Sequence, residues 1–192
     1  MERKVGPPPM MRQKIIAVVG MPGSGKAIVS KVASSRGIPV LVCGDVVREE
    51  TKKRGLAPTP ENTGKVMLAI RQEEGPAVVA KRLISKIASS AAPVLVVEGV
   101  RSMAEVEALR KDHLVAIVAV HSSPETRYQR LVARGRSDDP KSSEEFADRD
   151  ARELGVGIGD VIALAQEMLI NETSFEDMSA ASEAVLSRVT QK

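Results

Sequence analysis

A glycine-rich segment near the start of the chain has residue types suited to phosphate binding. It reads GMPGSGKA from Gly20 to Ala27, between a short β-branched run and an amphipathic one. Glycines permit backbone angles that turn successive N–H groups toward one anion, and a lysine adds positive charge where a helix dipole begins. A glycine-rich turn with an incidental lysine is the alternative, but the strand, loop, helix and lysine together favour a nucleotide-binding phosphate loop. The predicted nucleotide-binding residues are Gly20, Met21, Pro22, Gly23, Ser24, Gly25, Lys26 and Ala27.

Two positions of this loop bear on catalysis. Lys26 is a catalytic candidate because its charge falls at the β- and γ-phosphates of a bound nucleotide. Ala27 stands where a serine or threonine hydroxyl usually binds Mg²⁺. Because Mg²⁺ commonly keeps several waters, we expect phosphate oxygens, and waters fixed by carboxylates, to hold the metal instead.

Two further charged segments follow predicted strands. CGDVVR begins at Cys43 and EGVRS begins at Glu98. Open α/β sheets bind ligands at the carboxyl ends of their strands, so Arg48 and Arg101 should face the same crevice as the phosphate loop. A guanidinium suits a phosphate monoester, and we expect both arginines to bind the acceptor and Arg101 to take part in catalysis. The alternative is a surface ion pair with Glu49 or Glu98.

The same crevice is expected to contain two carboxylates. Glu98 is a candidate for holding Mg²⁺ through water. Asp45 either caps the following helix or binds substrate and acts as a catalytic base, and both roles remain open. The single cysteine, Cys43, is expected to pack rather than react, and neither His113 nor His121 has a partner suited to acid–base chemistry.

The segment 134–150, RGRSDDPKSSEEFADRD, is polar and dense in charges of both signs. We interpret it as a mobile lid, because basic residues on a closing segment can stabilise a transferring phosphoryl group and exclude water. A solvated helix with arginines paired to Glu144, Glu145 and Asp148 is the alternative. The catalytic candidates here are Arg134, Arg136 and Arg149, whereas Arg127, Arg130 and Arg152 are expected at the surface.

Short β-branched runs alternate with longer amphipathic segments, which predicts an α/β fold whose parallel sheet is covered on both faces. The long interval between the second and third strands, punctuated by prolines and glycines, predicts a helical insert. We therefore expect a flexible extension at 1–13 and one domain at 14–192, with the insert at about 45–93 and the lid at about 134–150. The expected strands are 15–19, 39–42, 94–97, 115–120 and 168–170.

Composition excludes several classes of protein. The 192 residues, 43% hydrophobic and 28% charged, suit one globular domain. A net charge of +3 and only 2% aromatic residues argue against nucleic-acid binding. One cysteine excludes an intrachain disulfide, and with two histidines it excludes a Cys/His zinc site. No apolar run is long enough to span a membrane, so we expect a cytoplasmic protein with a small-molecule partner.

Together these segments resemble the nucleoside-monophosphate kinase group of P-loop proteins, and the chain is most similar to an archaeal family described as adenylate-kinase-related or dephospho-CoA-kinase-like. The resemblance covers Lys14 to about Phe175. It implies a three-layer P-loop NTPase fold with a five-stranded parallel sheet of order 2-3-1-4-5, an acceptor-binding helical insert and a short lid. The segments that carry it are GMPGSGK, GDVVREE, PTPENTGKV, IRQEEGPAVVAKR, EGVRS, RGRSDDP, FADRDARELGVGIG and INET.

The resemblance also implies roles for single residues. GDVVR is similar to the adenylate-kinase element whose arginine binds the acceptor phosphate, here Arg48. EGVR is similar to the DGxPR element, which implies that Glu98 orders the metal and Arg101 binds phosphate. Departures at Ala27, at Glu98 in place of aspartate, and at the missing proline before Arg101 leave the acceptor open. RSDD is similar to the RxDD of a kinase lid, which implies lid roles for Arg136, Asp138 and Asp139.

Three functions follow from these residues. The first is ATP-dependent, Mg²⁺-assisted transfer to a nucleoside monophosphate, whose acceptor oxygen is already anionic and needs no base. The second is transfer to a hydroxyl, as in dephospho-CoA kinase, with Asp45 accepting the proton. The third is a nucleotide-binding regulator or slow ATPase without a small acceptor. The paired arginines argue against this third function, while Ala27 argues for it.

Overall fold

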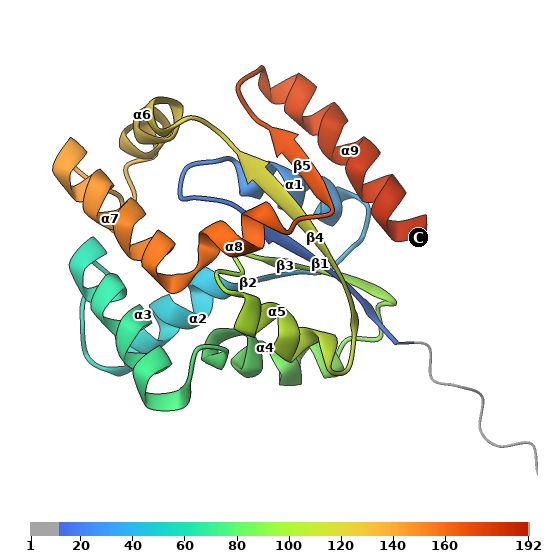
Figure 1. Cartoon of the computed structure of the whole chain (residues 1–192), viewed down its shortest axis with the longest axis horizontal. Helices are drawn as coiled ribbons and strands as arrows, with labels where there is room; N and C mark the ends of the chain where they lie inside the picture. Colours follow the sequence, from blue (N-terminus) through green and yellow to red (C-terminus); the bar gives the residue numbers. More distant parts are fainter. Residues whose placement is uncertain (1–11, 192) are drawn as a thin grey trace, which may run out of the picture.

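A five-stranded parallel sheet forms the centre of the computed structural model, which describes residues 12–191 (Figure 1). The strand order is β2-β3-β1-β4-β5, so the expected α/β class and sheet order are confirmed. Each expected strand is present to within one residue at either end. The expected extension at 1–13 lies almost wholly outside the described residues. The strands are β1 (Lys14–Val19), β2 (Val40–Val42), β3 (Val94–Glu98), β4 (Leu114–His121) and β5 (Glu167–Ile170).

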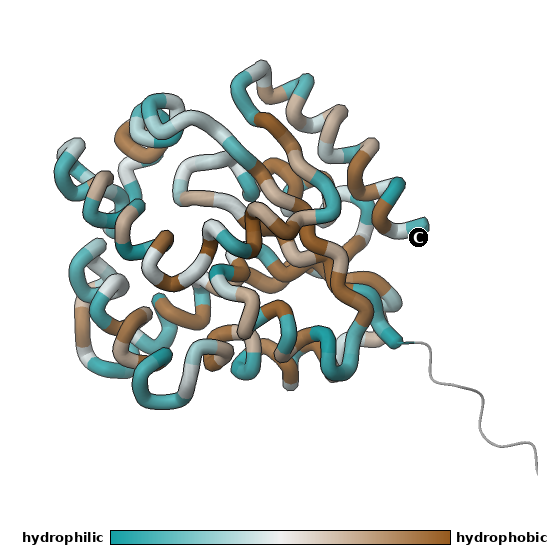
Figure 2. The backbone as a smooth tube through the Cα atoms, viewed as in Figure 1, coloured by the Kyte–Doolittle hydropathy of each residue, from teal (hydrophilic) through white to brown (hydrophobic). Residues whose placement is uncertain are grey.

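Helices cover both faces of the sheet. Ile16 and Val18 of β1 pack under α1 and α9, whereas Ile15 and Val19 pack toward α4, α5 and α8. Successive strand residues point to opposite faces, and both faces are buried, which explains the uninterrupted apolar run of β1. Figure 2 shows hydrophobic residues along the central strands, whereas the surrounding helices carry both hydrophobic and hydrophilic residues. These helices are α1 (Lys26–Ser35), α4 (Val78–Ala88), α5 (Met103–Arg110), α8 (Ile158–Ala163) and α9 (Phe175–Gln191).

The helices that surround the carboxyl ends of the strands come from two chain segments (Figure 1). The interval between β2 and β3 contains α2 (Cys43–Lys53), α3 (Pro60–Glu74) and α4, and the interval after β4 contains α6 (Pro124–Arg134) and α7 (Ser143–Val156). The second half of the expected lid is therefore the start of α7. Its Phe146 is buried, with its ring centroid 5.4 Å from that of Tyr128. The segment thus has an apolar anchor despite its polar composition.

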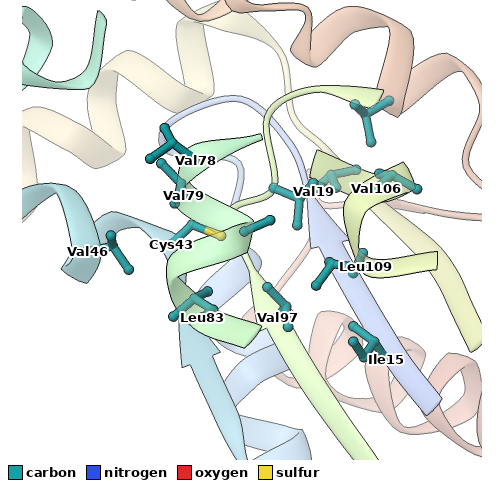
Figure 3. Close-up of a cluster of buried hydrophobic side chains, with 14 of the residues drawn as sticks. Ile15, Val19, Cys43, Val46, Val78, Val79, Leu83, Val97, Val106 and Leu109 are labelled. Atoms are coloured by element: carbon teal, nitrogen blue, oxygen red, sulfur yellow. The ribbon is translucent and has the colours of Figure 1, made fainter. Parts of the chain in front are cut away.

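Cys43 belongs to the hydrophobic core. Figure 3 shows its side chain among Val46, Val79 and Leu83, between α2 and α4. Burial raises the pKa of the thiol well above its usual range, so the reactive thiolate is disfavoured. The sequence-based interpretation of Cys43 as a packing residue agrees with this position. Among the described residues, no helix is both long enough and apolar enough to cross a membrane.

The loop that follows β3 is held by a buried ion pair. Glu105, fully buried at the start of α5, accepts a hydrogen bond from Arg71 of α3 at 2.7 Å and one from the Arg101 backbone N–H at 2.6 Å. Ser102 caps the same helix by accepting from the Glu105 N–H at 3.3 Å. One carboxylate therefore connects the helical insert to the residue that carries the Arg101 guanidinium.

Replacement of Glu105 tests this connection. Glu105→Ala leaves the buried Arg71 guanidinium without its partner, so we expect the free energy of unfolding to fall by about 3–5 kcal/mol. Glu107→Ala is the matched control, since Glu107 is exposed on the same helix and should change stability by less than about 0.5 kcal/mol. Urea denaturation of both variants measures the difference, and equal losses would contradict the role of Glu105.

Candidate functional site

The segment between β1 and α1 forms a tight loop that only glycine can complete. Gly23 and Gly25 have φ angles of +82° and +95°, in the left-handed region. A Cβ at Gly23 would lie 2.7 Å from the Arg127 carbonyl oxygen, and one at Gly25 would lie 2.0 Å from Nδ2 of Asn171. Both angle and space therefore exclude larger residues. The loop ends at the first turn of α1, where the first N–H groups of a helix lack the carbonyl partners that later ones have; the Ile28 N–H donates to the Gly25 carbonyl at 2.9 Å.

Three side chains hold the outer carbonyls of this loop. Asn171 donates from Nδ2 to the Ser24 carbonyl at 2.9 Å, and the Ser122 hydroxyl donates to the same oxygen at 3.2 Å. Arg127 donates from Nη1 to the Pro22 carbonyl at 3.2 Å. These hydrogen bonds engage the carbonyls on the outside of the loop and stabilise its shape. The sequence interpretation did not assign roles to Asn171 or Ser122, although Asn171 lies in the INET segment directly after β5.

Arg127 is not a surface residue, contrary to the sequence-based expectation. It is 3% exposed, and it makes a two-pronged ion pair with Asp150 of α7 at 2.8 and 2.5 Å. Its guanidinium carbon also lies 5.0 Å from the centroid of the Phe146 ring. A desolvated arginine needs such a partner, and the 23-residue separation from Asp150 hides the pair in the sequence. Arg127 therefore joins the phosphate loop to α7.

Lys26 folds back over the loop. Its Nζ donates to the carbonyls of Gly20 at 2.7 Å and Met21 at 3.1 Å. Burial lowers the pKa of Lys26 to about 8, against the opposing effect of the nearby Glu98 carboxylate. The hydroxyl of Ser24 is buried in the same loop and has no hydrogen-bond partner among the described residues. An ammonium group and an unused buried hydroxyl fit a phosphate chain in this loop.

A small central pocket next to the loop brings most of the predicted site residues together. Gly20, Pro22, Gly23 and Lys26 line one side of it. Its other side receives basic residues from four further parts of the chain, namely α2, the β3–α5 loop, the end of α6 with the segment after it, and α7. The arginines that line the central pocket are Arg48, Arg101, Arg134, Arg136 and Arg149.

Carboxylates of the lid and α7 pair with these arginines. Asp138 lies 3.7 Å from Arg48, and Glu153 lies 2.6 Å from Nε of Arg101. Arg48 also pairs with Asp45 on its own helix at 2.5 Å. The alternative prediction, a surface ion pair with Glu49 or Glu98, is therefore not what the structure shows for Arg48 and Arg101. Asp138 and Glu153 themselves line the central pocket, so Arg48 and Arg101 are held in part by groups that also face it.

Asp139 pairs with the two arginines at the ends of the lid. It accepts from Nε of Arg134 at 2.8 Å, and Nη1 of Arg149 lies 3.4 Å from it. Burial raises the pKa of Asp139, but the hydrogen bonds from Arg134 and the Arg136 N–H outweigh it and hold the pKa below its usual value. Burial lowers the pKa of Arg149, whose carboxylate neighbours oppose that effect. The partners expected for a solvated helix, Glu144, Glu145 and Asp148, do not make these pairs.

Asp45 lies outside the central pocket. Its side chain is 57% exposed, and it lines an outer groove of about 460 Å³ with Lys26, Ala27 and Arg130. Asp45 is the third residue of α2, and the helix is preceded by Val42, with no side-chain cap. The capping alternative for Asp45 is therefore wrong. Arg130, expected at the surface, lines the groove and donates from Nη1 to the Ser122 hydroxyl at 2.9 Å.

Glu98 lies beside the phosphate loop because β1 and β3 are neighbours. It pairs in register with Val18, and it lines both the central pocket and the outer groove. Its carboxylate accepts a hydrogen bond from the Ser30 hydroxyl of α1. Ser30 is three residues after Ala27 and so lies on the same side of the helix. The sequence interpretation did not identify Ser30 as a partner of Glu98.

A second pocket opens on the far side of the central one, against α3. The two share Arg48, Arg101 and Arg149, while Thr63, Gly64 and Arg152 belong to the second pocket alone. We call it the α3 pocket. Neither histidine lines these pockets: His113 is buried between α5 and β4, and His121 is exposed at the end of β4.

Comparison with known proteins places the chain in a family. The model of an AAA domain matches residues 19–147. A UPF0200 protein of Hyperthermus butylicus is 52% identical over 92% of this chain and 95% of the relative, and a UPF0200 protein of Pyrococcus horikoshii is 47% identical over 91% and 97%. Shikimate kinase from Acinetobacter baumannii, solved with shikimate, has the same fold, with 18% identity, a TM-score of 0.58 and 94% of each chain covered. This chain therefore belongs to the UPF0200 family and has a P-loop AAA domain with a kinase-like fold.

Proposed function

We propose that this protein transfers the γ-phosphoryl group of ATP to a phosphate oxygen of a small phosphorylated acceptor. The observation that carries the proposal is the central pocket, where Lys26 and five arginines surround one space beside the phosphate loop. Phosphoryl transfer depends on positioning and on stabilising negative charge rather than on covalent chemistry by the protein. A cluster of fixed cations between the phosphate loop and an acceptor site would supply both the positioning and the charge stabilisation.

The transfer itself needs little from the chain beyond these cations. The acceptor phosphate oxygen forms a bond to the γ-phosphorus, and the bond from that phosphorus to the β–γ bridging oxygen breaks, which leaves ADP. Lys26 and the loop amides would hold the donor phosphates, and Arg48 and Arg101 would hold the acceptor phosphate. Arg134, Arg136 and Arg149 would stabilise the charge of the transferring group.

The residues around Glu98 fit a magnesium ion that is bound mainly by phosphate and water. Among the described residues, no cluster of three acidic, histidine or cysteine ligands could hold a metal alone, and Ala27 has no hydroxyl. Glu98 would hold a metal-bound water, and Ser30 fixes the direction of its carboxylate. Bound Mg²⁺ supplies neutralisation of the β- and γ-phosphate charge.

The position of Asp45 supports the choice of a phosphate oxygen as acceptor. A hydroxyl acceptor needs a base within reach of its proton, whereas Asp45 lies in the outer groove and pairs with Arg48. An acceptor phosphate is already ionised and needs no base. A nucleoside monophosphate is the acceptor that the kinase resemblance implies, and a regulator or slow ATPase is the competing function that Ala27 would suit.

An ATP-consumption assay tests the proposal directly. With Mg²⁺ and ATP present, we expect a phosphomonoester acceptor to raise the rate of ADP formation at least about tenfold above the rate without acceptor. Arg101→Met should lower the acceptor-stimulated rate by about 10²-fold or more. The panel contains nucleoside monophosphates, small phosphomonoesters, dephospho-CoA and free nucleosides. If no acceptor raises ADP formation, the regulator replaces the kinase as the function.

The pH dependence of nucleotide affinity tests Lys26. Since burial lowers the pKa of Lys26 to about 8, the free protein loses this charge as the pH rises through 8, and bound phosphates favour the protonated form. We therefore expect the affinity for Mg-ATP to be constant from pH 7 to about 8 and then to fall by about tenfold per pH unit. Calorimetric titration measures it. Lys26→Met should bind more weakly and lack this fall, and an unchanged pH profile in this variant would assign the titration to another group.

Asp45→Asn separates the two kinds of acceptor. Loss of a catalytic base lowers turnover by about 10²- to 10⁴-fold, whereas transfer to a phosphate oxygen should leave kcat within about tenfold of wild type. Glu49→Gln, an exposed neighbour on the same helix, controls for the change in charge. Steady-state kinetics with the best acceptor of the panel measure kcat, and a collapse of kcat with unchanged ATP affinity would favour a hydroxyl acceptor.

A further inference from the structure

Arg152 occupies a place made for it by a glycine. Its guanidinium lies against Gly64 in the interior of α3, where a Cβ would be 2.9 Å from Cζ and 3.0 Å from Nε and Nη1. Glycine is disfavoured inside a helix relative to alanine, so Gly64 weakens α3. Because Gly64 has no side chain, Arg152 of α7 can approach the α3 backbone closely and line the α3 pocket.

Arg152 differs from the neighbouring arginines because no carboxylate among the described residues pairs with it. Arg48, Arg101 and Arg149 each have a carboxylate within ion-pair distance. For Arg152 no ion pair or side-chain hydrogen bond is found within residues 12–191, although the residue is half-buried. The adjacent carboxylate, Glu153, faces Arg101 instead. A guanidinium partly removed from water without a counter-charge favours an anionic ligand.

Arg152 also lies at the opposite end of the connected pockets from the phosphate loop. Lys26 lines the central pocket and Arg152 lines the α3 pocket, while the three shared arginines line both. The transferring group must be near Lys26 and the shared arginines. Because Lys26 does not line the α3 pocket, that pocket offers a place at Arg152 for an anion other than the phosphate that accepts the phosphoryl group.

The shape and composition of the α3 pocket limit the rest of the ligand. Its volume is about 70 Å³, and no aromatic side chain lines it among the described residues. Val47, Pro60 and Met67 provide a short apolar wall. Such a pocket suits a short carbon chain and offers no surface on which a base can stack.

We infer that the acceptor is a compact phosphomonoester with a second anionic group, a carboxylate or a phosphate, and that Arg152 binds this second group. The inference rests on the proposed function, because it extends the acceptor site described there. It replaces the nucleoside monophosphate with a smaller acceptor, since a nucleoside monophosphate has no anion beyond its single phosphate. Gly64 is the residue that positions Arg152 for this contact.

Three probes with the same carbon chain test the inference: propyl phosphate, 3-(phosphonooxy)propanoate and propane-1,3-diyl bisphosphate. Calorimetric titration in the presence of Mg-ADP should show that the wild-type protein binds the two double anions more tightly than propyl phosphate. Arg152→Gln should lower the affinity for both double anions by about 10- to 100-fold, as expected for a lost charge-assisted contact. The affinities for propyl phosphate and ADP should not change. Whichever double anion binds more tightly identifies the second group as carboxylate or phosphate.

Matched variants separate ligand binding from structure. Arg110→Gln removes the same charge from an exposed position on α5 and should change no affinity. Arg152→Lys should recover part of the affinity for the double anions. Gly64→Ala should keep or raise the melting temperature, because alanine favours helix. It should nevertheless lower the affinity for the double anions as Arg152→Gln does, because the new methyl group displaces the Arg152 guanidinium.

The possible failures are distinguishable. The second anion site would be overturned if the wild-type protein bound all three probes with equal affinity. It would also be overturned if Arg152→Gln lowered the affinity for propyl phosphate as much as the affinity for the double anions. AMP binding that is tighter than that of both double anions and independent of Arg152 would overturn it as well. If the double anions bind through Arg152 but no acceptor ever raises ADP formation, the anion site stands and the kinase proposal fails.

Discussion

The crowding of positive charge around one small space is the constraint on which the site depends. Lys26 and five arginines line the central pocket, and their mutual repulsion would open it if nothing opposed them. Asp138, Asp139 and Glu153 separate the arginines and hold their guanidinium groups in position. The site is therefore preorganised before any substrate arrives, and a substrate phosphate has to compete with these carboxylates. Binding becomes an exchange of one anion for another, which favours ligands with full phosphate charge over weaker anions.

One helix connects the parts of this arrangement. Within the five residues 149–153, α7 provides Arg149 and Glu153 to the central pocket and Arg152 to the α3 pocket, while Asp150 faces Arg127. Arg127 in turn holds the Pro22 carbonyl of the phosphate loop. The loop and Arg101, one of the two arginines proposed to bind the acceptor, are thus positioned by the same element, and a displacement of α7 would change both at once. Phosphoryl transfer requires donor and acceptor to be in line, and a shared support keeps that alignment.

The sequence predicts those features whose determinants are local. The strands, the phosphate loop and its helix follow from β-branched runs and glycine spacing, and the positions of Arg48 and Arg101 follow from the rule that parallel strands end at one edge. Features that depend on segments far apart in the chain were missed. The burial of Arg127 depends on Asp150, and the shape of the loop depends on Asn171, which is 147 residues from the carbonyl that it holds. Charge composition alone does not show how the lid is anchored, because the ring contact of Phe146 with Tyr128 depends on the packing of α7 against α6.

The alanine after the loop lysine bears on the choice between a kinase and a regulator. Ala27 removes the hydroxyl that would touch a metal directly, yet the next position on that side of α1 is Ser30, whose hydroxyl binds Glu98. A hydroxyl one turn further from the phosphates is suited to fixing a carboxylate, which then holds a metal-bound water. The loss of a direct ligand is thus accompanied by a fixed indirect one. Under the proposed function, Ala27 would therefore change how the metal is held without removing the transfer chemistry.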